Sequence, residues 1–509
     1  MYNRILSAAL CGMDVVPIRV EADVSDGLPQ FTMVGYLTSQ VREAEDRVRT
    51  SFRNAGFALP PKHITINMSP ADILKSGSRF DLPIALTVLA ADGILPADSL
   101  ENIMAAGELS LNGDINAVTG ILPIAAKALE IGVRLLIVPA GNAREAAAAG
   151  GLRVVGVRTL KEAVHFLKAG ELPSPVPEEI SSCSLNRYGC DFADIRGQEA
   201  VKRAAVIAVS GFHNLLLIGP PGSGKTMLAE RIPTILPSLT PEESFEITKI
   251  YSIAGLLPKD SPVIGTRPFR HPHHTISATA LAGGGRIPSP GEITLAHRGV
   301  LFLDEMPEFS RQSLEILRQP LEDREIVISR TSGSYRFPAN FLLLAAMNPC
   351  PCGYYPDMNR CSCQAKDIER YKNRISRPLL DRIDICAECP PVAYADLTEP
   401  DEARQTSASV RERVERVRRV QEMRFNGSEI HFNSEIPASK ISLYCRTDTE
   451  ADETLRRAFD RLHLSARAYH RIIRVARTIA DLDGAELIGK MHVMEAVHYR
   501  TIDGKYWRL

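Results

Sequence analysis

Net charge is almost absent from this sequence: its 509 residues include 60 Lys plus Arg and 61 Asp plus Glu. This balance excludes a uniformly basic nucleic-acid coat protein, but it leaves room for local basic patches. Hydrophobic residues make up 45% and charged residues 24% of the chain. These ordinary proportions exclude a disordered chain, a collagen and a coiled-coil rod. At about 150 residues per domain, the length predicts three globular domains, with two as the alternative.

Long apolar runs are also absent. The longest uncharged window, residues 204–224, is interrupted by Pro220 and Pro221, whereas a membrane-spanning helix needs about 20 predominantly apolar residues. The apolar run that begins at Ile5 stops by Gly12, which is short for a signal peptide. We therefore expect a cytoplasmic protein with no membrane partner. The 10 cysteines are few for this length, and a disulfide framework is not expected in that compartment.

The first third of the chain differs in pattern from the rest. Residues 1–170 mix short β-rich runs with an amphipathic helical pattern, which predicts a mixed α/β domain. The β-rich runs are residues 15–20, 63–67 and 135–138, and the helical pattern covers 39–53. Residues 171–189 are predicted to be a linker, because prolines at alternate positions from Pro173 to Pro177 forbid a helix and favour an extended spacer.

Two further segments follow the linker. Residues 190–391 alternate strands and helices around strong motifs, whereas 392–509 are almost entirely helical in pattern. Helical periodicity is strongest at 404–424 and 454–482. We therefore predict an α/β fold with a mixed first domain, a parallel-sheet second domain and a helical third domain.

A glycine-rich loop stands between a buried strand and a helix. The strand is Leu215–Ile218, and the loop consists of Gly219, Pro220, Pro221, Gly222, Ser223, Gly224, Lys225 and Thr226. The glycines allow backbone N–H groups to turn inward around phosphate oxygens. Lys225 would place its charge at the β- and γ-phosphates, and Thr226 would offer its hydroxyl to Mg²⁺. A nucleoside triphosphate site is favoured over the alternative, a glycine-rich surface turn.

Two other predicted strands end on polar side chains. Val300–Leu303 leads into Asp304 and Glu305, and Leu342–Met347 leads into Asn348. Asp304 would hold Mg²⁺ through its water shell, and Glu305 would polarise the attacking water. Asn348 would orient that water and sense the γ-phosphate. The alternatives are a solvated strand end for the two acids and an ordinary turn residue for Asn348.

The order of these motifs resembles an AAA+ ATPase and, in more detail, the magnesium-chelatase-like ComM/YifB family of bacterial proteins. The resemblance rests on stretches that span nearly the whole chain: GLPQFTMVG, GSRFDLPIAL, LLLIGPPGSGKTMLAERIP, RPFRHPHHTIS, PGEITLAHRGVLFLDEMPEF, LLAAMNPCPCGYY, PLLDRIDI and LSARAYHRIIRVARTIADL. The family implies ATP and Mg²⁺ as cofactors. It also implies a homo-oligomer, a hexameric ring with each ATP at a subunit boundary.

The resemblance assigns roles to residues outside the phosphate loop. Arg382 matches the arginine finger that reaches the neighbour's γ-phosphate, and Arg467 matches the second sensor on a helical lid. Guanidinium groups there would stabilise transition-state charge, so that hydrolysis depends on assembly. The alternative for both is a surface salt bridge. Residues 192–198, including Gln198, resemble the segment that contacts the adenine, which is compatible with a helix N-terminal turn capped by Asp194.

In related rings, hairpins of the ATPase domain point into a central pore. LEDREIVISRTSGSYRFPANF matches one such hairpin, and GGGRIPSPGEITLAHRG matches an insert ahead of the acidic strand. Arg286, Arg324, Arg330 and Arg336 would then contact a phosphate backbone, with a solvated hairpin face as the alternative. The seven arginines between residues 454 and 477 allow DNA contact as well, but an exposed amphipathic face is favoured.

The first domain resembles the proteolytic domain of Lon-type proteases without its catalytic dyad. That family needs a Ser nucleophile and a Lys that deprotonates it. The corresponding stretches read GSRFDLP, which contains Ser78 and Asp81, and VTGIL, which has Leu122 where the Lys should be. We expect no peptidase activity, and instead a structural or DNA-contacting collar on the ring.

Four of the cysteines crowd into one short stretch. Cys350, Cys352, Cys361 and Cys363 form two Cys-x-Cys pairs. Four thiolates in one loop can hold Zn²⁺ tetrahedrally, although Cys-x-x-Cys is the commoner spacing. The alternative is a loop with reduced, metal-free thiols. We therefore favour a Zn²⁺ site, in addition to ATP and Mg²⁺.

The family implies an ATP-driven motor that acts on forked or branched DNA, as a helicase or in branch migration during recombination or natural transformation. Two alternatives stay open: an ATPase subunit of a magnesium-chelatase-type enzyme that drives metal insertion, and a scaffold that uses ATP only to assemble. The Lon-like first domain argues against metal insertion. Glu305 and Arg382 argue that hydrolysis is retained.

Overall fold

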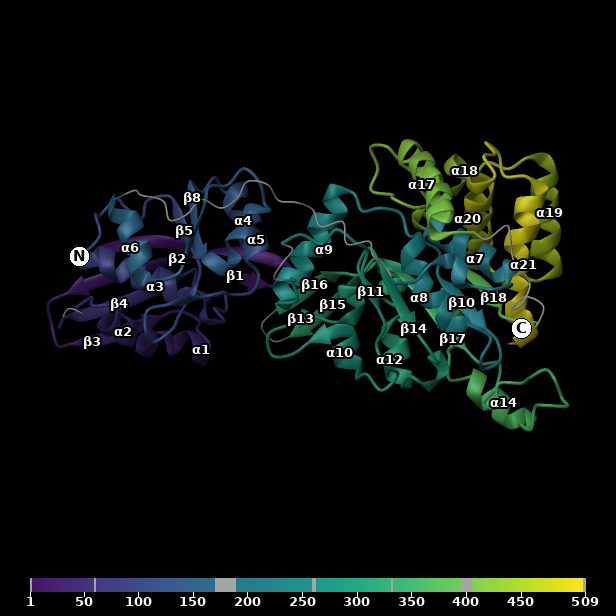
Figure 1. The fold of residues 1–509 in the computed structure, drawn as a ribbon, viewed down its shortest axis with the longest axis horizontal. Helices are drawn as coiled ribbons and strands as arrows, with labels where there is room; N and C mark the ends of the chain where they lie inside the picture. The colour runs from purple at the N-terminus through teal and green to yellow at the C-terminus, as the bar shows by residue number, and fades with distance from the viewer. Residues whose placement is uncertain are drawn as a thin grey trace.

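The computed structural model describes residues 2–58, 61–169, 189–258, 262–330, 333–392, 394 and 405–506. Figure 1 shows an elongated chain, with an N-terminal α/β region at one end, a second sheet in the middle and C-terminal helices at the other end. Apart from residue 189, the predicted linker lies outside the described residues. Among the described residues, no helix is both long and apolar enough to cross a membrane.

A mixed seven-stranded sheet forms the N-terminal region of the described chain, in the order β3-β4-β2-β1-β5-β8-β9. Its strands are β1 (Tyr2–Cys11), β2 (Asp14–Ser25), β3 (Gln30–Val34), β4 (His63–Ser69), β5 (Ile103–Ala105), β8 (Leu135–Pro139) and β9 (Val154–Val157). The β-rich runs predicted at 15–20, 63–67 and 135–138 are confirmed as parts of β2, β4 and β8. A short separate hairpin joins β6 (Glu108–Leu109) to β7 (Ile115–Asn116).

Helices accompany this sheet: α1 (Ser39–Arg42), α2 (Ala44–Asn54), α3 (Asp81–Ala91), α4 (Ile121–Glu130), α5 (Ala143–Ala147) and α6 (Leu160–Ala169). Every residue of α3 is buried, because this helix packs on β1 and β2, and its sequence is accordingly apolar almost throughout. The helix predicted over 39–53 is two helices, α1 and α2, which meet at Glu43.

A parallel sheet of five strands lies in the middle of the described chain, in the order β11-β14-β17-β10-β18. Its strands are β10 (Leu215–Ile218), β11 (Phe269–Arg270), β14 (Val300–Leu303), β17 (Leu342–Met347) and β18 (Ile385–Glu388). All residues of β10, β14 and β17 are buried. A parallel sheet is covered on both faces, which explains the unbroken apolar sequence of these strands. The predicted parallel-sheet fold is confirmed.

Helices and two small antiparallel pairs surround this sheet. The helices are α7 (Glu199–Gly211), α8 (Lys225–Ile235), α9 (Pro241–Ala254), α10 (Ala278–Ala282), α11 (Glu292–Leu295), α12 (Arg311–Ile316), α13 (Pro320–Asp323), α14 (Ala365–Lys372) and α15 (Arg377–Leu380). The pairs are β12 (Gly283–Gly284) with β13 (Ser289–Pro290), and β15 (Glu325–Arg330) with β16 (Gly333–Pro338). They coincide with the two predicted inserts. Arg330 Nε donates to Gly285 O at 3.3 Å, so the two inserts touch.

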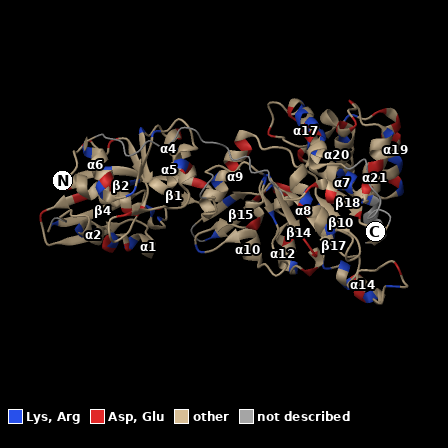
Figure 2. Cartoon of the chain, in the orientation of Figure 1, with Lys and Arg blue, Asp and Glu red and all other residues tan. Residues whose placement is uncertain are grey.

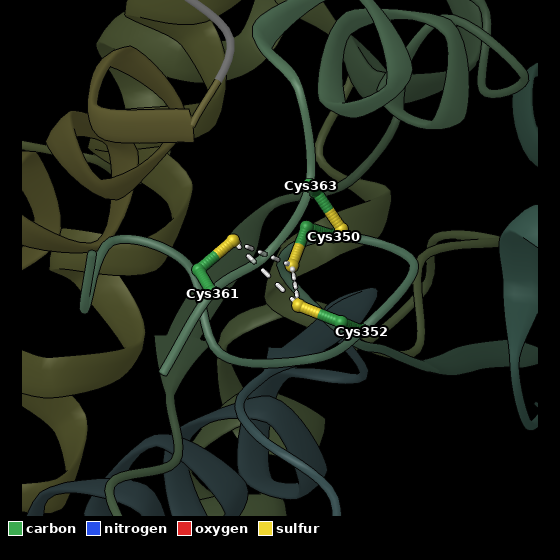
Figure 3. Close-up of side chains that lie close together, drawn as sticks. All are labelled: Cys350, Cys352, Cys361 and Cys363. Carbon is green, nitrogen blue, oxygen red and sulfur yellow. Dashed lines mark hydrogen bonds between the residues drawn. The ribbon is translucent and has the colours of Figure 1, made fainter. Parts of the chain in front are cut away.

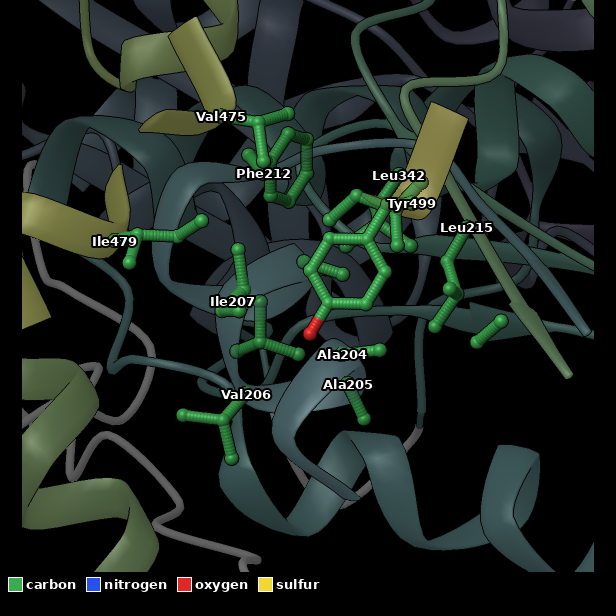
Figure 4. Packing of buried hydrophobic residues seen from close by; sticks show 14 of the residues in the cluster. Ala204, Ala205, Val206, Ile207, Phe212, Leu215, Leu342, Val475, Ile479 and Tyr499 are labelled. Carbon is green, nitrogen blue, oxygen red and sulfur yellow. The ribbon is translucent and has the colours of Figure 1, made fainter. Parts of the chain in front are cut away.

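The C-terminal region is helical, as predicted: α17 (Ser407–Arg424), α18 (Ile441–Tyr444), α19 (Thr449–Arg461), α20 (Ala466–Leu482) and α21 (Lys490–Tyr506). The helical segment predicted at 454–482 is interrupted between α19 and α20. There the Ser465 hydroxyl accepts the Ala468 N–H and starts a new helix. Figure 4 shows Val475 and Ile479 of α20 in the same hydrophobic cluster as Ile207 of α7. One core therefore joins these helices to the central sheet.

The N-terminal region contacts the central region through α9. The Gly120 N–H donates to Ser252 O at 3.0 Å, and the Ser252 hydroxyl donates to Glu145 Oε1 at 2.5 Å. Gly120 has a φ of 77°, and a Cβ there would lie 2.3 Å from Leu10 Cδ1, so that glycine alone fits without a shift of its neighbour. A second contact forms where Gly12, in the turn between β1 and β2, lies against β16.

Replacing Ile207 by Ala is expected to lower the free energy of unfolding by about 2–5 kcal/mol, because this fully buried side chain fills the core that α7 shares with the C-terminal helices. Leu443→Ala, at a side chain that is 55% exposed, should change it by less than about 0.5 kcal/mol. Urea unfolding of both variants measures the difference. Equal destabilisation by the two substitutions would contradict this packing.

Candidate nucleotide site

Three polar strand ends meet at the carboxyl edge of the central sheet. The phosphate loop, residues 219–226, follows β10, Asn348 follows β17 and Asp304 follows β14. Because β17 pairs with both β10 and β14 in parallel register, their carboxyl ends lie together. Gly222 and Gly224 have φ angles of 74° and 82°, which turn the loop through backbone conformations that favour glycine. The sheet topology thus gathers residues that lie far apart in the sequence.

Lys225 begins α8, and its side chain turns back into the loop. Its Nζ donates to two carbonyl oxygens of the loop, both at 2.8 Å, and to Asn348 Oδ1 at 3.1 Å. Burial lowers the pKa of this ammonium group, and the nearby carboxylates of Asp304 and Glu305 oppose that shift. A polyphosphate would favour the charged form in the same way. The loop therefore holds a positive charge beside Asn348.

Thr226 and Asp304 are in direct contact. Thr226 Oγ1 donates to Asp304 Oδ2 at 2.8 Å, so the two predicted Mg²⁺ ligands stand side by side. Their oxygen atoms fit this cation, which prefers oxygen ligands. Glu305 follows with a φ of 50°, an uncommon conformation for a residue other than glycine, and its side chain is 59% exposed. His274 Nδ1 lies 3.8 Å from Glu305 Oε2, a contact that no sequence motif predicts.

Gln198 also contacts the phosphate loop. Its Nε2 donates to the carbonyl oxygens of Ser223 and of Pro390, the latter at 3.1 Å. The short helical turn that precedes Gln198 is capped by Asp191, not by Asp194 as predicted. Asp191 stands before the turn, where its carboxylate reaches the free N–H groups, whereas Asp194 lies inside the turn and accepts the Asp191 N–H.

Arg382 and Arg467 lie together at the amino edge of the sheet. Arg382 O accepts a hydrogen bond from Asn214 Nδ2 at 2.9 Å, and Asn214 directly precedes β10. The guanidinium groups of both arginines bind the carboxylate of Glu322 in α13, Arg467 at 3.3 Å. The four residues of β10 span about 13 Å, so neither guanidinium contacts the phosphate loop of its own chain. No sequence pattern predicts that Glu322 pairs with these two arginines.

The two arginines line a cavity of about 470 Å³, together with Arg324, Arg471 and Arg474. Arg382 is only 9% exposed, whereas the side chains of Glu322 and Arg467 are 48% and 67% exposed, so the Arg467 contact is a surface salt bridge. Arg471 lies 3.9 Å from Asp384, whereas Arg474 forms no ion pair with any described residue. Five carboxylates line the same cavity, so its charges balance within the chain: Glu322, Asp323, Asp381, Asp384 and Glu435.

The four clustered cysteines come together after Asn348. Their sulfur atoms all lie within 4.8 Å of one another, and none of the four takes part in a disulfide. Figure 3 shows that the sulfurs of Cys350, Cys352 and Cys361 face one another. The predicted ligand set is therefore gathered at one point, and its chemistry fits a thiophilic metal ion.

In the N-terminal region, a carboxylate stands beside Ser78, whose hydroxyl contacts Glu108. Leu122 is fully buried, and its N–H donates to Glu145 at 3.0 Å. The lack of peptidase activity stays a prediction. So does the likeness of this region to a Lon-type proteolytic domain.

The hairpin arginines fall into two groups. Arg336 is 74% exposed and lies 3.2 Å from Glu325, and Arg286 and Arg330 are also exposed, around the contact between the two inserts. Arg324 lies at the base of the hairpin instead, 3.8 Å from Glu435. It therefore belongs to the cavity at the amino edge.

The arginine-rich C-terminal helices carry interspersed charges (Figure 2). Arg457 lies 2.5 Å from Glu453, and Arg416 lies 4.0 Å from Glu412. Arg477 is 2% exposed and lies 2.8 Å from Asp481 inside the protein. These contacts favour the interpretation of structural and solvated helices over a DNA-binding arm.

The parallel sheet, the phosphate loop at its carboxyl edge and the packed C-terminal helices define an AAA+ ATPase fold. Three family models match the chain. They are "magnesium chelatase, subunit ChlI" over residues 191–397, "subunit ChlI of Mg-chelatase" over 20–142, and "magnesium chelatase, subunit ChlI C-terminal" over 404–500.

Similar proteins narrow this class further. The chain is 43% identical over 504 residues to competence protein ComM of Haemophilus influenzae, covering 98% of this chain and 97% of that protein. It is 42% identical to the uncharacterized protein YifB of Escherichia coli, covering 97% and 96%. The magnesium-chelatase 38 kDa subunit of Cereibacter sphaeroides is 27% identical over 31% of this chain and 52% of its own. The chain belongs to the ComM/YifB family of magnesium-chelatase-like AAA+ ATPases.

Gln198→Ala is expected to weaken nucleotide binding about fivefold, because the phosphate loop loses one hydrogen bond, at Ser223 O, that contributes about 1 kcal/mol. Titration with a fluorescent ATP analogue measures the change. Gln40→Ala, at an exposed residue of the N-terminal region, is the matched control and should bind normally. Unchanged affinity of the Gln198 variant would remove this residue from the site.

Proposed function

We propose that the protein is an ATP-hydrolysing motor that works as a closed homo-oligomer, a hexameric ring. The observation that carries this proposal is the separation of two half-sites. The phosphate loop, Asp304 and Asn348 share the carboxyl edge of the sheet, while Arg382 and Arg467 share the amino edge. A phosphate held by the loop meets both sets only if a neighbouring chain supplies the arginines. Head-to-tail contacts of this kind form a closed ring when the rotation between neighbouring chains closes, and an open filament when it does not.

Each side chain has a definable part in hydrolysis. Lys225 neutralises the β- and γ-phosphates, and Glu305 takes up a proton from the attacking water, which Asn348 orients. Mg²⁺, held by Thr226 and Asp304, would offset phosphate charge. Arg382 and Arg467 of the next chain stabilise the charge that develops on the γ-phosphate.

Glu322 connects this chemistry to movement. In the single chain both arginines are paired with the Glu322 carboxylate. When they bind the γ-phosphate held by a neighbouring chain, the phosphate replaces this carboxylate as their partner. Glu322 lies in α13, which leads directly into the hairpin β15–β16. Loss of the Glu322 ion pairs therefore changes the contacts at the base of that hairpin. We infer that hydrolysis moves the hairpin by breaking and remaking these ion pairs.

DNA is the proposed substrate of the motor, with helicase or branch-migration activity in the cytoplasm. Two observations support it. Arg286, Arg330 and Arg336 are exposed around the two touching inserts, where they suit a phosphate backbone. The similar protein of Haemophilus influenzae is named a competence protein. A magnesium-chelatase-type activity is the second candidate, favoured by the descriptions of the matching family models.

Mixing two inactive variants tests the shared site. Arg382→Ala alone should lower turnover about 10³-fold or more, and Lys225→Ala should abolish it. In an equal mixture of the two variants, about one interface in four combines an intact phosphate loop with an intact Arg382. The ATPase rate of the mixture should therefore reach about a quarter of the wild-type rate, as measured by phosphate release.

The matched control mixes Lys225→Ala with Glu305→Ala. Both residues belong to the same half-site, so no interface is complete and no activity should return. Equal outcomes for the two mixtures would contradict a site shared between chains. A protein that assembles with ATP but releases no phosphate would be a scaffold.

DNA coupling is tested by steady-state ATPase rates with and without forked and four-way DNA. We expect the ATPase rate to rise when DNA is present.

DNA affinity measured at several salt concentrations tests the hairpin. Arg336→Ala should make the plot of log affinity against log salt concentration shallower by about 0.7–0.9, whereas Arg457→Ala on α19 should leave its slope unchanged. Indifference to DNA combined with activation by a chelatase subunit would favour metal insertion. Normal turnover by Lys225→Ala would contradict the nucleotide site.

A further inference from the structure

We propose that Cys350, Cys352, Cys361 and Cys363 bind one Zn²⁺ ion that braces the nucleotide site from its carboxyl edge. The cluster begins two residues after Asn348, and its loop packs directly against the phosphate loop. In this proposal the bound metal fixes the positions of Asn348 and Pro221. This bracing role rests on the proposed nucleotide site, whereas metal binding by the four cysteines does not.

The spacing of the sulfur atoms fits a tetrahedral ion. Four thiolates at about 2.3 Å from zinc lie about 3.8 Å from one another. The Sγ atoms of Cys350, Cys352 and Cys361 are separated by 3.4, 3.8 and 3.6 Å. Cys363 completes the set within 4.8 Å of the other three (Figure 3). The ligands therefore need little movement to enclose an ion.

The surroundings of the sulfurs also suit a tetrathiolate centre, which carries net negative charge. Cys350 is fully buried and accepts the Tyr355 N–H at 3.4 Å, the kind of backbone donor that holds a metal-bound thiolate in place. Two cations stack on the rings of the same loop. Lys372 Nζ lies 4.6 Å from the Tyr355 ring, and the Arg360 guanidinium lies 4.1 Å from the Tyr354 ring. Their charge offsets that of the thiolates.

The bracing contact is made at Gly353, the residue directly after the first Cys-x-Cys pair. Its N–H donates to Cys350 O at 3.0 Å, so its place depends on the cluster. A Cβ at Gly353 would lie 2.3 Å from Pro221 Cδ in the phosphate loop. On the other side, Asn348 accepts a hydrogen bond from Lys225. An ion that fixes the cysteine loop therefore restrains the phosphate loop at two points.

The metal site is tested on the full-length protein, purified in reductant without added chelator. We expect one zinc per chain by elemental analysis, both in the wild type and in Lys225→Ala. Cys350→Ser and Cys361→Ser should lose the ion, and Cys190→Ser, outside the cluster, should keep it. If the first two variants fail to fold, cobalt-loaded wild type replaces them. It should show the visible absorption bands of tetrahedral thiolate-bound cobalt. The site would be overturned if the purified wild type contained no zinc and showed no such bands after cobalt was added.

The brace is tested by nucleotide affinity rather than turnover. Removal of zinc by a chelator should weaken binding of a fluorescent ATP analogue about tenfold, and re-addition should restore it. Gly353→Ala should weaken binding while the zinc is retained, since its side chain pushes against Pro221. Unchanged affinity after zinc removal would overturn the brace. If the wild type binds zinc but no nucleotide at all, the failure lies in the proposed ATPase function, not in the metal site.

Discussion

The direction of the parallel strands is the constraint on which the rest of this protein depends. Every strand of the central sheet runs the same way, so residues that follow strands gather at one edge and residues that precede them gather at the other. Lys225 and Asp304 belong to the first edge, and Arg382 belongs to the second. Four buried residues of β10 separate the edges. Within one chain, a group held at one edge is therefore out of reach of the side chains at the other edge.

Buried charges fix the C-terminal helices to this sheet and so decide where Arg467 stands. Asp481 of α20 is 7% exposed and accepts hydrogen bonds from Arg424 of α17, from Arg477 and from Asn433. Removing one partner from such a network leaves a buried charge uncompensated, which costs about 3–5 kcal/mol. The network therefore restricts how the helices pack. It holds α20 so that its first turn reaches the amino edge of the sheet.

Helix α9 ties all three parts of the chain together. Glu243, near its start, is 2% exposed and lies 2.6 Å from Arg267 and 3.5 Å from Arg418 of α17. Ser252, near its end, binds Gly120 and Glu145 of the N-terminal region. The turn at Gly120 precedes Leu122, the position where the Lys of a Lon-type dyad is expected. In this chain that turn serves as a contact between regions.

Local patterns in the sequence determined the elements and the half-site at the carboxyl edge. Buried strands read as apolar runs, and loops such as 219–226 have a fixed spacing, because their chemistry is local. The sequence could not reveal Glu322, His274 or the approach of Gly353 to Pro221, since these contacts join residues far apart in the chain. Nor could it separate Arg324 from the other hairpin arginines, or place the cap at Asp191. Only the tertiary structure decided which edge each side chain occupies, because strand order and packing are properties of the whole fold.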